Sequence, residues 1–343
     1  MRPASRRPDV PRHPRNSCTD FAALNPYTAP AWLPGGHAQT IYTALLARPA
    51  VGFQRERWET PDGDFIDLDW AGPADAANLL VLFHGLEGSS KSHYARAIAR
   101  HAKDLGWRCV IPHFRGCSGE SNRLPRAYHS GDSPEIDWIL RRAQALAPSR
   151  KVHACGLSLG GNALLKWLGE QGNAASGIVS GAVSVSAPLD LAAAGHALGR
   201  GFNLAYTRMF LDTLKRKAAE KLIRFPGSFD GAAMRASGTL YEFDNAVTAP
   251  LHGFRDTDDY WLRASSWPLL AGIQAPTLVL NARNDPFLPE HALARARDAS
   301  KHVTLEFPKH GGHVGFLSGP FPGHHGWLAE RIFKHYSDPT PSR

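Results

Sequence analysis

The residue of this chain with the clearest chemical potential is a serine in a G-x-S-x-G pattern. Residues 156–160 (Gly-Leu-Ser-Leu-Gly) follow residues 151–155, a short run typical of a buried strand, and precede residues 162–168, which have helical spacing. A serine at a sharp strand-to-helix turn is strained, and the flanking glycines remove Cβ atoms that would crowd the turn. The pattern predicts that Ser158 is a nucleophile. The amide of Leu159, at the start of the helix, would hold a developing oxyanion.

A nucleophilic serine of this kind needs a carboxylate and a histidine, in the chain order serine, acid, histidine. Asp285 lies just beyond residues 275–281, an apolar strand-like run, and His313 lies in a Gly-rich loop after residues 303–307, a second such run. We interpret His313 as the base that takes the proton of Ser158 and returns it to the leaving group. Asp285 would orient the imidazole and stabilise its charged form.

Three other residues compete for these roles in the sequence. His310 lies three residues before His313, and Asp190 follows residues 177–185, an apolar run at whose end some hydrolases place their acid. Ser118 lies in a glycine-flanked turn but lacks the G-x-S-x-G framing. We favour Ser158, Asp285 and His313 over them, and the alternatives stay open at this point.

A second oxyanion donor is expected from the turn after residues 78–83, a continuous apolar strand. Residues 84–90 (His-Gly-Leu-Glu-Gly-Ser-Ser) follow it directly, and the backbone N–H of Leu86 is placed where this type of turn supplies an amide. His84 is interpreted as a residue that holds the loop by hydrogen bonding. His37, in a Pro-Gly-Gly-His segment, is interpreted as a turn or capping residue.

The strand-like and helix-like segments alternate along most of the chain. An antiparallel hairpin is expected first, followed by strand–helix–strand units whose right-handed crossovers give parallel pairing. We predict an α/β fold with a mostly parallel central sheet and helices on both faces. The expected strands are residues 55–60, 65–70, 78–83, 108–113, 151–155, 177–185, 275–281 and 303–307, and the expected helices include residues 92–105, 132–147, 162–168 and 327–336.

The chain is expected to form one domain with an insertion. Residues 1–25 are rich in proline and arginine and are predicted to be a disordered basic tail, and residues 26–338 form the catalytic domain. The strand pattern stops over residues 190–271, which are helix-like to about residue 222 and then irregular. We predict that this insertion caps Ser158 and shapes an acyl pocket. Residues 215–217 (Lys-Arg-Lys) are expected to be a solvated helix face, with weak contact to a membrane surface as the alternative.

Composition narrows the possible functions. The net charge is +8 over 343 residues, but about half of the excess lies in the tail, so no basic face or module for nucleic acid is expected. The four cysteines have no metal-ligand spacing and are interpreted as reduced thiols of a cytoplasmic protein without a secretory signal. We expect neither a metal nor an organic cofactor, and composition does not determine the oligomeric state.

Six motifs together resemble the AB hydrolase 4 family of the α/β-hydrolase superfamily, which groups bacterial YheT-like proteins with eukaryotic abhydrolase-domain relatives. The resemblance covers about residues 30–335, and the basic tail is not part of it. It implies an α/β-hydrolase fold and a serine esterase acting on carboxylic esters, with Ser158, Asp285 and His313 as the charge-relay residues. The motifs are residues 33–40 (LPGGHAQT), 84–88 (HGLEG), 113–119 (HFRGCSG), 156–161 (GLSLGG), 249–254 (APLHGF) and 311–316 (GGHVGF).

The leading functional hypothesis is therefore a carboxylesterase for small-molecule esters with short or medium acyl chains. Acyl transfer or thioester hydrolysis on the same three residues is an alternative, because water or another nucleophile can resolve an acyl-enzyme. A non-catalytic scaffold with this fold is the third hypothesis, although such proteins usually lack a member of the triad.

Overall fold

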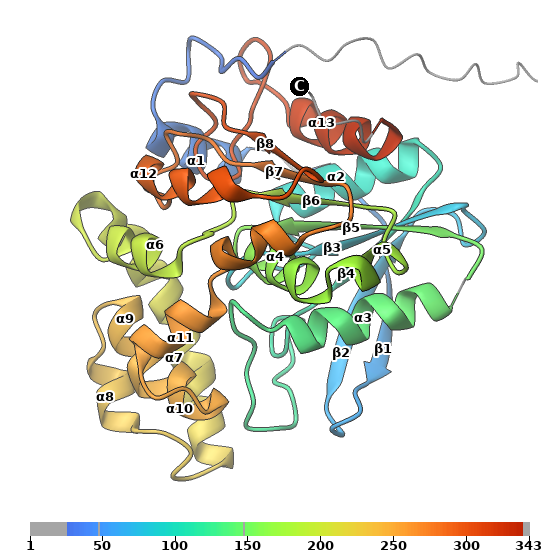
Figure 1. The fold of residues 1–343 in the computed structure, drawn as a ribbon. Coiled ribbons are helices and arrows are strands. Elements are labelled where there is room, and N and C mark those ends of the chain that lie inside the picture. The colour runs from blue at the N-terminus through green and yellow to red at the C-terminus, as the bar shows by residue number, and fades with distance from the viewer. Residues whose placement is uncertain (1–25, 47–48, 147, 339–343) are drawn as a thin grey trace, which may run out of the picture.

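The computed structural model describes residues 26–46, 49–146 and 148–338 (Figure 1). The predicted basic tail, residues 1–25, lies outside the described residues. An eight-stranded sheet with strand order β1-β2-β4-β3-β5-β6-β7-β8 forms the centre. The strands are β1 (Gln54–Glu59), β2 (Phe65–Ala71), β3 (Asn78–Phe83), β4 (Arg108–Pro112), β5 (Lys151–Leu157), β6 (Gly181–Val185), β7 (Thr277–Leu280) and β8 (Val303–Glu306).

The pairing of the strands confirms the predicted fold class. Strand β2 pairs antiparallel with both β1 and β4, whereas β4, β3, β5, β6, β7 and β8 pair parallel. The carboxyl ends of these parallel strands therefore share one edge of the sheet, where loops can combine side chains from distant parts of the sequence.

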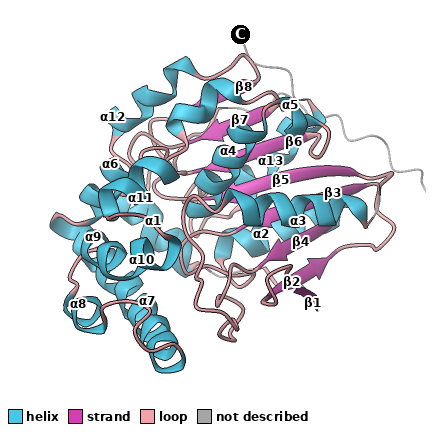
Figure 2. Ribbon diagram, turned by 60° about the horizontal axis from the view of Figure 1, so that its bottom comes forward, coloured by secondary structure: helices cyan, strands magenta, loops and turns pink. Residues whose placement is uncertain are grey.

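Helices cover both faces of the sheet (Figure 2). On one face α2 packs against α13, and on the other α3 packs against α4. The helices outside the insertion are α1 (Gly36–Leu45), α2 (His93–Asp104), α3 (Ser133–Ala145), α4 (Leu159–Gln171), α5 (Asn173–Ser176), α12 (Glu290–Leu293) and α13 (Gly326–Ser337). No helix of the described ranges has the length and apolar character needed to span a bilayer.

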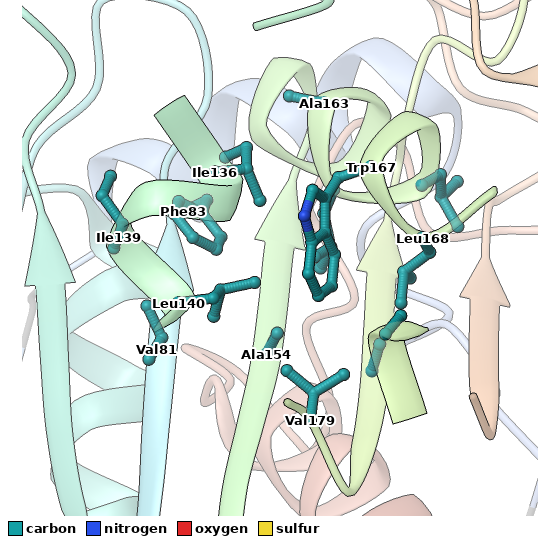
Figure 3. Packing of buried hydrophobic residues seen from close by; sticks show 14 of the residues in the cluster. Val81, Phe83, Ile136, Ile139, Leu140, Ala154, Ala163, Trp167, Leu168 and Val179 are labelled. Atoms are coloured by element: carbon teal, nitrogen blue, oxygen red, sulfur yellow. The ribbon is translucent and has the colours of Figure 1, made fainter. Parts of the chain in front are cut away.

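Strand β3 shows why the sheet must be covered twice. Its residues Leu79, Val81 and Phe83 belong to one buried cluster and Leu80 and Leu82 to another, because successive side chains of a strand point to opposite faces. Figure 3 shows the first cluster, in which side chains of α3 and α4 lie against those of the central strands. Burial on both faces explains the continuous apolar runs in the sequence.

The predicted antiparallel hairpin, β1–β2, contains buried carboxylates. Every residue of β2 is buried, including Asp67 and Asp69. Arg57 Nε lies 2.7 Å from Asp67 Oδ1, and Arg55 Nε lies 2.8 Å from Asp69 Oδ1, so arginines of β1 pair with both carboxylates. The arginines offset the cost of burying these carboxylates.

The segment between β6 and β7 is helical throughout most of its length, which corrects the prediction of an irregular second half. Short helices form there because Asp230, Thr239 and Asp256 accept hydrogen bonds from the first backbone amides of α8, α9 and α11. These helices lie together beside the sheet in Figure 1. They are α6 (Leu191–Leu198), α7 (Leu204–Arg224), α8 (Gly231–Ala236), α9 (Leu240–Phe243), α10 (Ala249–His252) and α11 (Thr257–Ala264).

Candidate active site

Ser158 lies at the turn between β5 and α4, in the conformation that the sequence predicted. Its φ is 52° and its ψ is −121°, a region that non-glycine residues rarely adopt. A Cβ on Gly156 would lie 2.4 Å from the carbonyl oxygen of Gly160, and a Cβ on Gly160 would lie 2.5 Å from that of His84. The predicted reason for both glycines is confirmed, since any larger residue would disrupt the turn.

The structure brings Ser158, His313 and Asp285 together at the carboxyl edge of the sheet. His313 Nε2 lies 2.9 Å from Ser158 Oγ, and His313 Nδ1 lies 2.8 Å from Asp285 Oδ2. Asp285 is fully buried, and its other oxygen, Oδ1, accepts a hydrogen bond from the backbone amide of Phe287 at 2.8 Å. With Nδ1–H directed at the carboxylate, Nε2 is free to accept the proton of the serine hydroxyl.

Helix α1 holds the loop that carries His313, a role that sequence reasoning did not assign. Thr40 Oγ1 accepts a hydrogen bond from the amide of His313 at 2.9 Å, and Gln39 Oε1 accepts one from the amide of Gly311 at 2.9 Å. Asn284 Oδ1 accepts the amide of Gly312 at 3.0 Å. Gln39 and Thr40 belong to the LPGGHAQT motif. The motif's part in the family resemblance was the sequence signal that could have indicated a role for these two residues near the site.

The rival residues lie elsewhere. His310 is exposed, and its side chain contacts Asn284 at 3.5 Å. Asp190 is the N-cap of α6, where it accepts the amide of Ala193 and pairs with Arg295 at 2.7 Å. The carboxylate of Asp190, the alternative acid, is therefore used in capping a helix and pairing with an arginine. The carbonyl of Ser118 accepts a hydrogen bond from Arg55.

Two backbone amides remain available beside Ser158. In the part of the chain that the structure describes, the N–H groups of Leu86 and Leu159 donate to no protein acceptor, whereas Gly85 N–H donates to the hydroxyl of Tyr94 and Glu87 N–H to that of Tyr128, both at 2.9 Å. The neighbouring amides are thus fixed by tyrosines. Leu86 and Ser158 line the same cavity, which agrees with the geometry that an oxyanion site requires.

His84 crosslinks the loop that carries Leu86. Its Nδ1 donates to the carbonyl of Gly85 at 2.8 Å, and its Nε2 accepts the amide of Phe114 at 3.1 Å. Burial lowers the pKa of His84 to about 3, so the imidazole stays neutral and keeps one donor and one acceptor. The interpretation of His84 as a residue that holds the loop agrees with these contacts.

The basic residues 215–217 and His37 make contacts that were not predicted. Lys217 Nζ lies 2.7 Å from Glu87 Oε2, and Lys215 Nζ donates to the carbonyl of Arg235 at 2.8 Å, so both lysines are partly exposed and paired within the protein, whereas Arg216 is exposed. His37 is neither a turn nor a cap residue. It lies within α1, and its Nδ1 is 3.1 Å from the hydroxyl of Tyr206 of α7. Lys217 and His37 both connect the sheet domain to the insertion.

A cavity of about 120 Å³ lies between Ser158 and the insertion. Its wall is largely aliphatic and aromatic. From the sheet domain it includes Leu86, Leu159, Tyr128 and Phe287, and from the insertion it includes Leu191, Leu198, Phe210, Leu214, Leu240 and Phe243.

Known proteins resemble this chain over most of its length. The model of the family described as alpha/beta hydrolase fold matches residues 78–320. An Escherichia coli K12 protein named "Putative esterase YheT" is 41% identical, covering 86% of this chain and 88% of its own. Human "Phospholipase ABHD3" is 29% identical, covering 90% of this chain and 78% of its own. The solved "Esterase (EaEST) from Exiguobacterium antarcticum" has a TM-score of 0.55 at 16% identity, covering 83% of this chain and 100% of that one, a likeness in fold alone.

Proposed function

Since this chain belongs to the α/β hydrolase fold family, we propose that it is a serine hydrolase that cleaves carboxylic esters through an acyl-serine intermediate. The observation that carries the proposal is the continuous contact from Ser158 Oγ through the imidazole of His313 to the buried carboxylate of Asp285. With the groups in this order, the imidazole can take the proton of the serine hydroxyl at neutral pH, and the carboxylate stabilises the imidazolium that forms.

In the first half of the reaction, His313 Nε2 takes the Ser158 proton while Oγ attacks the carbonyl carbon of the ester. The carbonyl oxygen becomes an oxyanion, which the amides of Leu86 and Leu159 stabilise together with the positive end of α4. The imidazolium formed on His313 is stabilised by Asp285. It then protonates the leaving alkoxide oxygen, the carbon–oxygen bond of the ester breaks, and the alcohol departs.

In the second half, water replaces the alcohol. His313 takes a proton from the water, the hydroxide oxygen attacks the acyl carbon, and the bond to Ser158 Oγ breaks. The proton returns to Oγ, and a carboxylic acid is released. The same acyl-enzyme would form from a thioester, or pass its acyl group to another alcohol, so the competing reactions differ in the groups that enter and leave.

The insertion, residues 190–271, is proposed to be a cap that forms the acyl pocket. The cavity volume of about 120 Å³ is well above the roughly 10–15 Å³ that a single water needs, so the cavity can hold a group of several non-hydrogen atoms. Its aliphatic and aromatic wall favours an alkyl chain. These properties support short or medium acyl groups.

The names of relatives support the ester bond as the target. The Escherichia coli protein is named "Putative esterase YheT", the human one "Phospholipase ABHD3", and a Saccharomyces cerevisiae relative that is 27% identical over 82% of this chain is named "Monoacylglycerol lipase". All three names refer to the cleavage of esters, and the yeast name refers to a carboxylic ester, although the yeast protein is matched over only 61% of its own length.

Labelling with a fluorophosphonate and turnover of p-nitrophenyl esters test the proposal. We expect covalent labelling and hydrolysis by the full chain and neither by Ser158→Ala, with unchanged far-ultraviolet circular dichroism. Product analysis with added alcohols, and with acyl-CoA, distinguishes hydrolysis from acyl transfer and thioester cleavage. A protein that is inert to both reagents and to acyl-CoA would refute the proposal.

A further inference from the structure

One carboxyl group lines the cavity that opens on Ser158, and the proposed reaction does not use it. Asp244 begins η2 (Asp244–Thr248), a π-helical turn between α9 and α10, which are both labelled in Figure 1. Turns of this type are rare and often occur at functional sites. Asp244 contributes to the cavity from the insertion, whereas Ser158 contributes from the edge of the sheet.

Two neutral side chains donate hydrogen bonds to the carboxyl group of Asp244. Thr248 Oγ1 donates to Asp244 Oδ1 at 2.6 Å, and Trp261 Nε1 donates to Oδ2 at 2.9 Å. A carboxylate accepts about four hydrogen bonds, so these two leave room for further donors. Because Asp244 lines the cavity, we take its remaining acceptor positions as the place where an occupant of the cavity would donate a hydrogen bond.

The surroundings of Asp244 make its charged form unfavourable unless the carboxylate accepts enough hydrogen bonds. Burial raises the pKa of Asp244 to about 6, although the hydrogen bonds from Thr248 and Trp261 oppose the shift. The carboxylate form therefore predominates above pH 7, beside a wall that is mainly aliphatic and aromatic. A saturated alkyl chain that displaced water from this cavity would leave a charge without enough donors, which is unfavourable.

We propose that Asp244 is a specificity residue that selects acyl groups carrying a hydrogen-bond donor, such as a hydroxyl, on the part of the chain distant from the ester. The inference rests on the proposed function, because it names the acyl group that the pocket beside Ser158 takes. A hydroxyl would donate to a free acceptor position of Asp244 while the methylene groups before it contact the apolar wall. A carboxylate at the same position would be repelled.

Matched esters isolate the donor. The p-nitrophenyl esters of hexanoic, 6-hydroxyhexanoic and 6-methoxyhexanoic acid differ at the distal end, and the methoxy group accepts hydrogen bonds but donates none. At pH 8 we expect kcat/KM for the hydroxy ester to exceed that for the methoxy ester about tenfold, the size expected for a hydrogen bond to a charged group. Heptanoate and octanoate homologues, each with its hydroxy and methoxy partner, locate the best chain length.

Variants of Asp244 test whether the preference comes from this side chain. Asp244→Leu removes the acceptor, and we expect it to reduce the hydroxy-to-methoxy ratio to about one. Asp244→Asn keeps an oxygen for one of the two existing donors, Thr248 or Trp261. It is therefore expected to fold even if Asp244→Leu does not. Its expected ratio lies between those of the wild type and the leucine variant. Asp258→Asn is the matched control, because Asp258 is an exposed carboxylate of the same insertion that accepts a hydrogen bond from the hydroxyl of Tyr241 at 3.1 Å.

Binding to Ser158→Ala keeps the test independent of turnover. Calorimetry with the same esters should show tighter binding of the hydroxy ester than of the methoxy ester, and the difference should disappear in Ser158→Ala/Asp244→Leu. Hydrolysis that depends on Ser158 but shows no hydroxy preference at any chain length would overturn the inference and leave the proposed function intact. A preference that survives in Asp244→Leu would also overturn it. Absence of all hydrolysis would count against the proposed function, and binding would then decide the role of Asp244.

Discussion

Two groups in this protein contain the same three residue types and differ in how they are connected. In the candidate active site, the imidazole lies between the hydroxyl and the carboxylate, so a proton can pass from serine to histidine. In the second group, the carboxylate lies between the hydroxyl and the imidazole. The first group is Ser158, His313 and Asp285, and the second is Ser90, His113 and Asp69.

The second group is a structural crosslink. Ser90 Oγ donates to Asp69 Oδ2 at 2.5 Å, His113 Nε2 lies 2.9 Å from the same oxygen, and Arg55 binds both oxygens of Asp69. The other ring nitrogen of His113 faces the carbonyl of Cys117. Neither nitrogen therefore faces Ser90, and no base is placed to remove its proton.

Access differs as well. Ser158 lines a cavity, whereas Ser90 and His113 are each only 2% exposed. The comparison teaches that the types of residues do not define a catalytic serine. The order of the hydrogen bonds and the access of substrate to the hydroxyl define it.

Removal of the two serine hydroxyls should give the largest contrast. Ser158→Ala should lower kcat by about 10⁶-fold, because the nucleophile is lost. Ser90→Ala should retain most of its kcat and lose roughly 1.5–3 kcal/mol of unfolding free energy, as expected for a hydrogen bond to a charged group. Steady-state kinetics and urea unfolding of both variants check this. Substantial residual turnover by Ser158→Ala would break the comparison.

Neutralising the carboxylate of the active site should have the next largest effect. Asp285→Asn should reduce kcat about 10⁴-fold, since an amide no longer holds Nδ1–H of His313 toward it or stabilises the imidazolium. Kinetics with p-nitrophenyl acetate and a thermal unfolding scan separate chemistry from folding. Asp190→Asn serves as the control for a carboxylate with a helix-capping role, and it should leave kcat within a few-fold of the wild type.

The matching change in the second group should act on stability. Asp69→Asn leaves Arg55 without its charged partner and weakens the contacts of Ser90 and His113, so we expect a loss of about 3 kcal/mol in unfolding free energy. Chemical unfolding monitored by tryptophan fluorescence measures it. A variant with wild-type stability and a kcat reduced as strongly as in Asp285→Asn would show that the second group takes part in the chemistry.

The smallest expected effect is on the pH dependence of stability, to which Asp69 of the second group contributes. Burial alone would raise the pKa of Asp69, but hydrogen bonds from His113, Arg55 and Ser90 outweigh it and hold the pKa well below its usual range. A carboxyl with a depressed pKa stabilises the fold above its unfolded pKa of about 4, and this stabilisation is lost as the pH falls toward the folded value. Unfolding free energies between pH 7 and pH 3 should therefore decline less steeply in Asp69→Asn than in the wild type.

Local sequence patterns were sufficient to predict much of the fold. Apolar runs placed six of the strands, and a hairpin signal placed β1 and β2, although the run 177–185 overestimated β6, which begins at Gly181 after the short helix α5. The hairpin signal was correct, but the burial of Asp67 and Asp69 could not be predicted, because their arginine partners lie on the neighbouring strand. Similarly, the contacts of Lys215 and Lys217 could not be predicted, because their acceptors come from other parts of the chain.

The sequence by itself determined the turn at Ser158, because glycines at 156 and 160 and the change from strand to helix are local requirements of the backbone. It also indicated the order of serine, acid and histidine along the chain. Only the tertiary structure decided that Gln39, Thr40 and Asn284 hold the histidine loop, and that Asp244 faces the cavity. These arrangements depend on contacts between residues that are far apart in the chain, and local periodicity carries no information about which distant segments meet.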